Sequence, residues 1–393
     1  MNFDLTDDQR MLKEGAARYF EKSYDFKQRL QRARSEGGFS RAVWQEMAEM
    51  GWLAAGIAED HGGLGFGPVE ITLIAEECGR HLVLEPFTAC GVLPAAIITH
   101  VAHDEQKSER LQAIAAGERL YAVACSEPDA RGDLAQVACR ARRVADGTWR
   151  LSGRKSLVVG APIADRLLIV ARSRGEVGEI AGLAVFDANT ETRGFRLERY
   201  ALVDGTPAAD LVLEDVQLPA ETLLGPYGQA GDGLQRALDE AIVAQCAETV
   251  GGCEDVLALC SEYLKTRKQF GVPIGSFQAL QHRMADMAIE TSQARASLHR
   301  GLEALATASA ERRSVDVSGV KAQVLKSARF VTQQGIQLHG GYGITEEYRV
   351  GHHWRRLLLT DTVFGSQAHH LDRYARRIQF DATAAFAAYD RRA

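Results

Sequence analysis

The chain has 393 residues and a net charge of −6, so it has room for two or three domains and no basic surface for nucleic acid. Its apolar runs are too short to span a membrane, and the acidic, amphipathic N-terminus is unlike a signal or transit peptide. Seven cysteines without a CxxC pair argue against a disulfide framework or a zinc site. These features predict a cytoplasmic globular protein with neither nucleic-acid nor membrane partners.

Residues 1–120 carry the signals of helices. Thr6–Gln9 reads as a capping box, and Ser40 reads as the N-cap of a second helix. Pro68 suits the first position of a third helix, and a fourth is expected over residues 104–116. Because no strand-like alternation precedes Leu120, we predict an N-terminal helical domain.

The pattern changes to short β-rich runs over residues 121–226. Asp146-Gly147 is a strong hairpin signal between the first two runs. Short strands with regular turn signals predict a middle antiparallel barrel or sandwich. The expected strands are Gln136–Val144, Trp149–Ser152, Arg166–Arg172, Gly182–Phe186, Phe195–Tyr200 and Ala209–Leu213.

Residues 227–393 read as long helices joined by short links, which predicts an antiparallel helical bundle. Cys246, Cys253 and Cys260 recur every seven residues, as buried thiols on one helix face do. The whole chain is therefore predicted to be α+β, with helical, β and helical-bundle domains in that order. The histidine pairs at 352–353 and 369–370 lack the spacing of a metal site and receive no role.

One link between two of these helices has an unusual composition. The stretch Tyr263–Arg283 breaks the helical pattern with glycine and proline, and it places Arg267, Gln269 and Phe270 where the helix ends. A guanidinium, an amide and an aromatic ring suit a phosphate and a stacked ring. A solvated helix end with a buried phenylalanine anchor would use similar residues, so both interpretations stay open at this point.

The same stretch carries a resemblance to a known family. Residues 266–283, TRKQFGVPIGSFQALQHR, and residues 337–348, QLHGGYGITEEY, resemble two motifs of the acyl-CoA dehydrogenase family at their usual separation. The resemblance covers nearly the whole chain. Within the family it is strongest to the small subunit of pimeloyl-CoA dehydrogenase and to relatives that act on steroid side-chain CoA thioesters, which are two-component enzymes.

The resemblance implies FAD as cofactor, lying across a dimer interface, with one protomer holding the flavin ring and its neighbour the ADP half. The ADP-half motif is intact here. Arg267 would meet the pyrophosphate, and glycines would let the backbone come close to it; Gly340-Gly341 could instead be a helix C-cap and turn. The residues that the resemblance assigns to this half are Arg267, Gln269, Phe270, Gln278, Gln337, Gly340 and Gly341.

The flavin-half motif is eroded. Ser126 matches a family hydroxyl that faces the isoalloxazine and could still serve. The glycine- and serine-rich continuation of the family is replaced by Asp129–Asp133, and an aromatic and hydroxyl pair is replaced within Lys155–Val159. We interpret the second run as a packing surface more than a cofactor surface.

The catalytic base is the sharpest departure from the family. Phe364 occupies the place of the usual glutamate, and phenylalanine cannot remove a proton. Some members carry the glutamate at the position of Ala241. Glu240 is its neighbour, but one residue turns a helix by about 100°, and we read Asp239-Glu240 as a solvated face. Glu248 lies within an apolar run, where a buried structural hydrogen-bond acceptor is the favoured interpretation and a displaced base the alternative.

These losses on one side of the cofactor predict the small subunit of an α2β2 acyl-CoA dehydrogenase. A paralogous subunit would supply the flavin contacts and the base, an acyl-CoA would be the substrate, and an electron-transfer flavoprotein would be the acceptor. Three alternatives remain: a complete homotetrameric dehydrogenase with Glu248 or Glu240 as base, a flavin-free structural subunit, and a flavin oxidase or monooxygenase acting on another substrate.

Overall fold

The computed structural model describes residues 4–35 and 37–390, with side chains described up to Ile378. The predicted helix caps are confirmed: Thr6 and Gln9 form the reciprocal capping box, and the Ser40 hydroxyl accepts a hydrogen bond from the amide of Val43. The N-terminal helices are α1 (Asp7–Ser23), α2 (Phe26–Arg34), α3 (Arg41–Glu49), α4 (Pro68–Arg80), α5 (Leu93–Val101) and α6 (Asp104–Ala115); a π-helical turn, η2 (Phe87–Val92), leads into α5.

An eight-stranded sheet follows, in the order β6-β7-β3-β2-β4-β5-β8, with β1 paired to β4. Its pairings are antiparallel except those of β1 and β2 with β4. The four residues of β1 are all buried and so lack the alternation that would have predicted a strand. The strands are β1 (Tyr121–Ala124), β2 (Arg140–Arg143), β3 (Trp149–Val159), β4 (Arg166–Arg172), β5 (Leu183–Asn189), β6 (Phe195–Ala201), β7 (Pro207–Leu218) and β8 (Leu223–Leu224).

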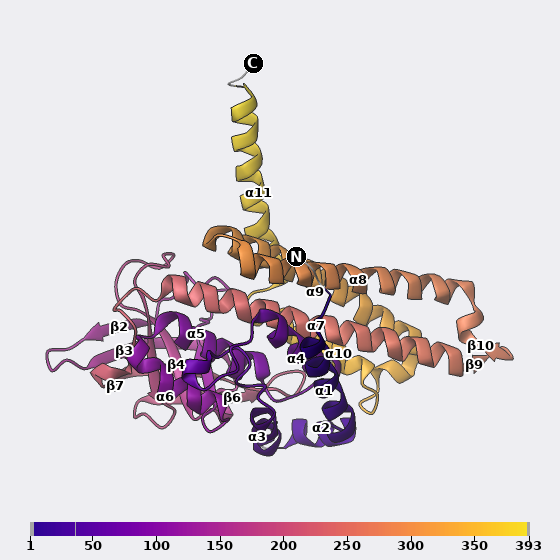
Figure 1. Ribbon diagram of the computed structural model, residues 1–393, viewed down its shortest axis with the longest axis horizontal. Coiled ribbons are helices and arrows are strands. Elements are labelled where there is room, and N and C mark those ends of the chain that lie inside the picture. The colour runs from indigo at the N-terminus through magenta and orange to yellow at the C-terminus, as the bar shows by residue number, and fades with distance from the viewer. Residues whose placement is uncertain (1–3, 36, 391–393) are drawn as a thin grey trace.

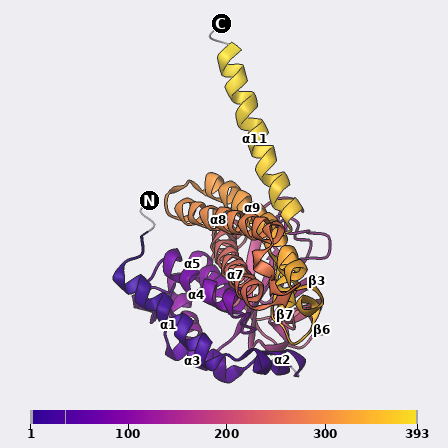
Figure 2. The ribbon, with the colours of Figure 1, turned by 90° about the vertical axis from the view of Figure 1, so that its right-hand side faces the viewer.

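The C-terminal region is helical, and the predicted fold class is confirmed. Cys246, Cys253 and Cys260 are buried free thiols on α7, as expected. No helix in the described part of the chain is both long and apolar enough to cross a membrane. The helices are α7 (Gly231–Thr266), α8 (Gln278–Thr307), α9 (Ala310–His339), α10 (Val350–Thr360) and α11 (Gln367–Asp390), and a small hairpin of β9 (Lys268–Gln269) and β10 (Val272–Pro273) joins α7 to α8. In both ribbon views α11 projects from the body of the molecule (Figure 1, Figure 2).

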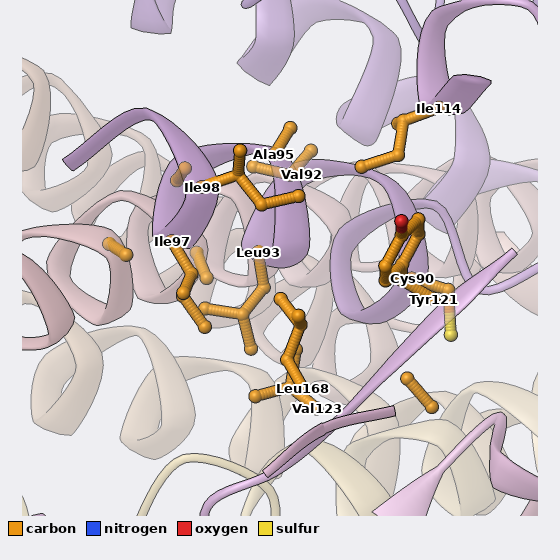
Figure 3. Close-up of a cluster of buried hydrophobic side chains, with 14 of the residues drawn as sticks. Cys90, Val92, Leu93, Ala95, Ile97, Ile98, Ile114, Tyr121, Val123 and Leu168 are labelled. Atoms are coloured by element: carbon orange, nitrogen blue, oxygen red, sulfur yellow. The ribbon is translucent and has the colours of Figure 1, made fainter. Parts of the chain in front are cut away.

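Buried apolar side chains hold the N-terminal helices against the sheet. Figure 3 shows Leu93 and Ile97 of α5 meeting Val123 of β1 and Leu168 of β4. On its other side this helical domain packs closely on α7, because a Cβ at Gly79 of α4 would lie 1.8 Å from the carbonyl oxygen of Glu248. The middle of α7 is thereby fixed against α4 of the N-terminal domain.

Candidate active site and cofactor-binding surface

A cavity of about 570 Å³ lies where the three domains meet. Leu93, Leu238 and Ile242 give it an apolar wall from α5 and α7, while the polar groups of the lining come mainly from loops and from α11. A cavity of this size, mostly apolar with a few polar groups, is typical of a small-molecule site. The residues of its wall from the sheet and the following loop include Val123, Ser126, Gly132, Asp133, Leu157 and Val159.

Ser126 lies in the cavity wall, on a loop fixed by a buried ion pair. The carbonyl of Ser126 accepts a hydrogen bond of 3.0 Å from the amide of Ser156. The next residue, Glu127, accepts 2.7 Å from Nζ of Lys155 and also accepts from the amides of Ala138 and Cys139. Because both charged side chains are buried and paired, the position of Ser126 is set by its neighbours on β3 and in the loop before β2.

Phe364 stands in the same wall, on a loop with unusual backbone geometry. Its φ is +61° and that of Gly365 is +97°, and the first value is uncommon for an aromatic residue. The carbonyl of Phe364 accepts 2.8 Å from Nε2 of His370, and the carbonyl of Val363 accepts from Nζ of Lys321. Burial lowers the pKa of His370 to about 2, so its ring is neutral. Two buried basic side chains therefore hold two consecutive carbonyls of this loop.

A second surface lies at the opposite end of α7, on the β9–β10 hairpin and the turn after α9. The ring of Phe270 is 90% exposed, so the alternative of a buried anchor is wrong. Tyr263 of α7 lies 6.2 Å from Tyr342, ring centre to ring centre, which brings the two sequence motifs to one place. Arg267, Gln269, Gln278, Gln337, Gly340 and Gly341 are likewise exposed there.

The cavity and this exposed surface are far apart in one chain. Helix α7 has 36 residues and is therefore about 54 Å long at 1.5 Å per residue. Leu238 faces the cavity near its start, and Arg267 follows its last residue. Leu238 and Arg267 are therefore about 44 Å apart along the helix axis, so the cavity and the exposed surface of a single chain are separate places.

Comparison with known proteins decides the family. The N-terminal, middle and C-terminal domain families of acyl-CoA dehydrogenase match residues 6–118, 122–216 and 231–379. The chain belongs to the acyl-CoA dehydrogenase family. It is 29% identical to acryloyl-CoA reductase (NADH) of Anaerotignum propionicum, over 96% of each chain. It is 30% identical to acyl-CoA dehydrogenase FadE12 of Mycobacterium tuberculosis, over 78% of this chain and 80% of the relative.

Solved structures agree with the assignment to the acyl-CoA dehydrogenase family. A variant of the steroid ACAD Tcur3481–Tcur3483 superposes with a TM-score of 0.86 at 27% identity, covering 96% of this chain and 99% of that one. A chain solved in work on the electron transferring flavoprotein of Acidaminococcus fermentans superposes with a TM-score of 0.87 at 28% identity, with the same coverage.

Acyl-CoA dehydrogenases use FAD, and the exposed surface fits its ADP half. Within the described part of the chain, the guanidinium of Arg267 makes no hydrogen bond or ion pair and is open to a phosphate. Apart from their own chain neighbours, none of the residues that the structure describes comes within 4 Å of a Cβ placed on Gly340 or Gly341, so a ligand can approach their backbone closely. Gly340 is also the C-cap of α9, and the two roles are compatible.

The run Leu157–Val159 lies partly in the cavity wall and partly in the core. Leu157 and Val159 line the cavity, and only Val158 is buried in the core between them. The strand is irregular here, with a register shift between Lys155 and Val158 and a φ of +54° at Leu157, and this bulge decides which side chains face the cavity. The aliphatic side chains present no ring or hydroxyl to a flavin, so this part of the cavity fits the flavin half less well than the distal surface fits ADP.

Glu248 lies behind Phe364, in a smaller cavity of about 50 Å³. Its carboxylate accepts a hydrogen bond from the hydroxyl of Thr88 and lies 3.8 Å from Nη1 of Arg356. Burial raises the pKa of Glu248, although the charge of Arg356 opposes the rise. Glu248 therefore has the hydrogen bond that the favoured interpretation predicts, and the displaced base stays the alternative prediction.

The prediction for Asp239-Glu240 is wrong at Asp239. That carboxylate is buried and accepts 2.8 Å from Nε of Arg313 and also accepts from the hydroxyl of Ser314. Glu240 faces a different cavity from the one beside Phe364, as the helix rotation predicted. There it pairs with Arg236 at 2.6 Å and with His100 at 3.2 Å, and although burial opposes ionisation, these partners lower the pKa of Glu240.

The carboxylates in the wall of the larger cavity also have hydrogen-bond or ion-pair partners. Asp133 accepts 2.9 Å from the amide of Ala135, which closes a turn, and Asp372 pairs with Arg376 at 2.6 Å on α11.

Sequence reasoning missed Lys321, whose signal is a lysine within the apolar face of α9. Lys155 and Glu127 were missed as a pair, because nothing in the sequence shows that two residues 28 positions apart meet.

Proposed function

We propose that this chain is the small subunit of a two-component, FAD-dependent acyl-CoA dehydrogenase. It would supply the ADP half of each FAD site through Arg267, Phe270 and the Gly340-Gly341 backbone, while a paralogous subunit in an α2β2 assembly supplies the flavin contacts and the base. FAD, when bound, accepts a hydride from the β-carbon of an acyl thioester after a base removes the α-proton.

The observation that carries the proposal is the side chain of Phe364 in the wall of the larger cavity. The carboxylates that line this cavity, Asp133 and Asp372, are held by a backbone amide and by an arginine. Glu248 is held by Thr88 on the far side of Phe364. A general base must reach the proton that it removes, and the position that carries the base in most of the family holds an aromatic ring here, which has no proton acceptor.

The similarity to known proteins supports the choice of partners. The steroid ACAD Tcur3481–Tcur3483 pairs two components by its name, and it covers 96% of this chain. The similar chain from work on the Acidaminococcus fermentans flavoprotein supports an electron-transfer flavoprotein as the electron acceptor. The substrate is an acyl-CoA thioester.

FAD content and oligomeric state of the purified chain test the proposal. We expect a protein with little bound flavin that gains stoichiometric FAD only when a paralogous subunit is co-expressed. Absorbance and light scattering measure both quantities. A yellow homotetramer with one FAD per chain that dehydrogenates acyl-CoA would overturn the proposal.

A complete homotetrameric dehydrogenase is the second candidate, because the cavity of about 570 Å³ is retained in this chain together with Ser126. In that case Glu248 would have to act as the base from behind Phe364. A flavin-free structural subunit is the third, and it predicts that replacing Arg267 in the assembled complex leaves flavin content unchanged.

A further inference from the structure

A third cavity, of about 180 Å³, lies between the N-terminal helical domain and α7. Helix α7 contributes to the walls of two cavities, with Leu238 in the larger one and Ala244 in the third. Val92 and Ala95 also line the third cavity, and they lie on the side of their helix away from Val123 of the sheet (Figure 3). Of the residues that the structure describes, none lines both cavities. The third cavity is therefore a separate space that the proposed function leaves unused.

The size and the wall of the third cavity fit a single aromatic ring. Most of the wall is apolar, and it includes the rings of Trp52, Phe66 and Phe87. An apolar cavity of about 150 Å³ binds benzene, so a cavity of about 180 Å³ has room for one ring with a small substituent. Aromatic side chains attract such a ring in offset or edge-to-face arrangements. Phe66 is 42% exposed, so a ligand can reach the cavity from solvent at this side chain.

One group of side chains gives this wall a hydrogen-bond acceptor. Among the described residues, the charged or titratable side chains of the wall are His100, Arg236 and Glu240. Oε1 of Glu240 accepts 2.6 Å from Nε of Arg236, and Nε2 of His100 lies 3.2 Å from Oε1 and 3.3 Å from Oε2. Each carboxylate oxygen has two lone pairs, so Oε2 can accept a further hydrogen bond.

The charges of the group decide which donor it accepts. The guanidinium of Arg236 balances the carboxylate of Glu240, and it is itself held by the carbonyl of Leu305, to which its Nη1 donates at 3.1 Å. An ammonium would meet the positive charge of Arg236, and a second carboxylate would meet the negative charge of Glu240. An uncharged hydroxyl donates to the carboxylate without either repulsion.

We propose that the third cavity is a binding site for a monocyclic phenol, with the ring among Trp52, Phe66 and Phe87 and the hydroxyl donating to Glu240. The site requires neither FAD nor acyl-CoA, so the inference goes beyond the proposed function and each can fail without the other. A hydrocarbon ring of the same shape fills the cavity but forms no hydrogen bond with Glu240.

Three probes of similar shape test the chemistry of the ligand. Calorimetry on the purified full-length chain gives the affinities of p-cresol, toluene and 4-methylbenzoate. We expect one p-cresol per chain, bound at least tenfold more tightly than either of the other two. Glu240→Gln keeps an acceptor but removes its charge, and hydrogen bonds to a charged acceptor are the stronger ones. This variant should bind p-cresol at least threefold more weakly and toluene unchanged.

Filling the cavity tests where the ligand binds. Ala96 of α5 lines the third cavity, whereas Ala89 of η2 lines the larger one. Ala96→Leu should abolish p-cresol binding, because the longer side chain takes the space of the ring, and the matched control Ala89→Leu should retain it. Ala244→Leu fills the third cavity from α7 and should have the same effect as Ala96→Leu. Thermal unfolding without ligand selects the filling variants that fold, and the two positions keep the test independent of either one.

The outcomes decide the inference without reference to flavin. Absence of saturable p-cresol binding, or equal affinities for p-cresol and toluene, would overturn it. Binding that survives a folded Ala96→Leu or Ala244→Leu variant would also overturn it, and loss in Ala89→Leu alone would place p-cresol in the larger cavity. FAD content of the chain with a paralogous subunit remains the separate measure of the proposed function.

Discussion

Nε of Arg356 donates to Oδ2 of Asp204 across 2.6 Å, which joins α10 to the turn between β6 and β7. The same guanidinium donates 2.7 Å to the carbonyl of Val83 in the N-terminal helical domain, so one side chain contacts all three domains. Asp204 is buried, and although burial opposes ionisation, Arg356 and other partners lower the pKa of Asp204. The bond therefore fixes the orientation of the domains around the larger cavity.

Replacing Arg356 by methionine should lower the free energy of unfolding by about 3–5 kcal/mol, because it leaves the buried carboxylates of Asp204 and Glu248 without their counter-charge. Urea unfolding followed by fluorescence measures the loss. The matched control is Arg355→Met, since Arg355 pairs with the exposed Glu346 and an exposed pair is worth less than about 1 kcal/mol. Equal losses of unfolding free energy in both variants would show that the buried ion pairs of Arg356 contribute no more than the exposed pair of Arg355.

Two glycines set the distance between α4 and α7. A Cβ at Gly79 would lie 1.8 Å from the carbonyl oxygen of Glu248, and one at Gly251 would lie 2.0 Å from that of Glu76. Backbone atoms cannot yield as a flexible side chain can, so either change to alanine should cost about 3 kcal/mol, the upper end of the usual cost of overpacking. In contrast, Gly15 of α1 has no atom within 4 Å of such a Cβ, and Gly15→Ala should stabilise by about 0.5–1 kcal/mol. Thermal unfolding of the three variants measures whether the changes at Gly79 and Gly251 lower the stability and the change at Gly15 raises it.

The fold could be read from the sequence because its signals are local. The Thr6–Gln9 box and the long apolar helices depend on neighbours a few residues away. Asp239 was misread because its partner Arg313 lies 74 positions later, on another helix. The contact of Lys321 with the loop of Phe364 was missed for the same reason, because only the tertiary structure brings this lysine of α9 to the loop.

The charge of Lys321 should make stability depend on pH. Burial lowers the pKa of Lys321 to about 7, although Cys246 and Asp361 act in the opposite sense. Its unfolded pKa is near the ordinary value of about 10.4. Between these values the unfolded state binds more protons, so the free energy of unfolding rises with pH by about 1.4 kcal/mol per unit.

Lys321→Met lacks this dependence, so its difference from the wild type should change by that slope between pH 7 and 9. Urea unfolding at several pH values measures the difference. His370, which also faces Lys321, stays neutral over this range, because burial and the charge of Lys321 lower the pKa of His370 to about 2. Lys326→Met should run parallel to the wild type, because its lysine is exposed. If the free energy of unfolding of Lys321→Met changed with pH as that of the wild type does, the buried lysine would not titrate in this range.

The distal surface can be tested without disturbing the fold. Arg267 is exposed, so Arg267→Met should change the free energy of unfolding by less than about 0.5 kcal/mol. A charge-assisted hydrogen bond to phosphate is worth about 1.5–3 kcal/mol, so FAD affinity of the assembled complex should fall at least tenfold. Lys268→Met next to it is the control, and FAD retained per chain after gel filtration is the measurement. Equal retention in both variants would argue against an ADP site here.

Phe364→Glu separates the half-site proposal from a complete enzyme. The substitution places a carboxylate in the wall of the larger cavity, where most of the family carries its base. If this chain held the flavin ring beside that wall, the new base should raise octanoyl-CoA turnover by about 10²–10⁴-fold. Under the half-site proposal we expect no gain in the purified chain, since a base without a hydride acceptor completes no reaction, and Glu248→Gln should likewise change nothing. Reduction of an electron-accepting dye measures turnover. A gain in Phe364→Glu, or a loss of activity in Glu248→Gln, would place a working flavin site within this chain.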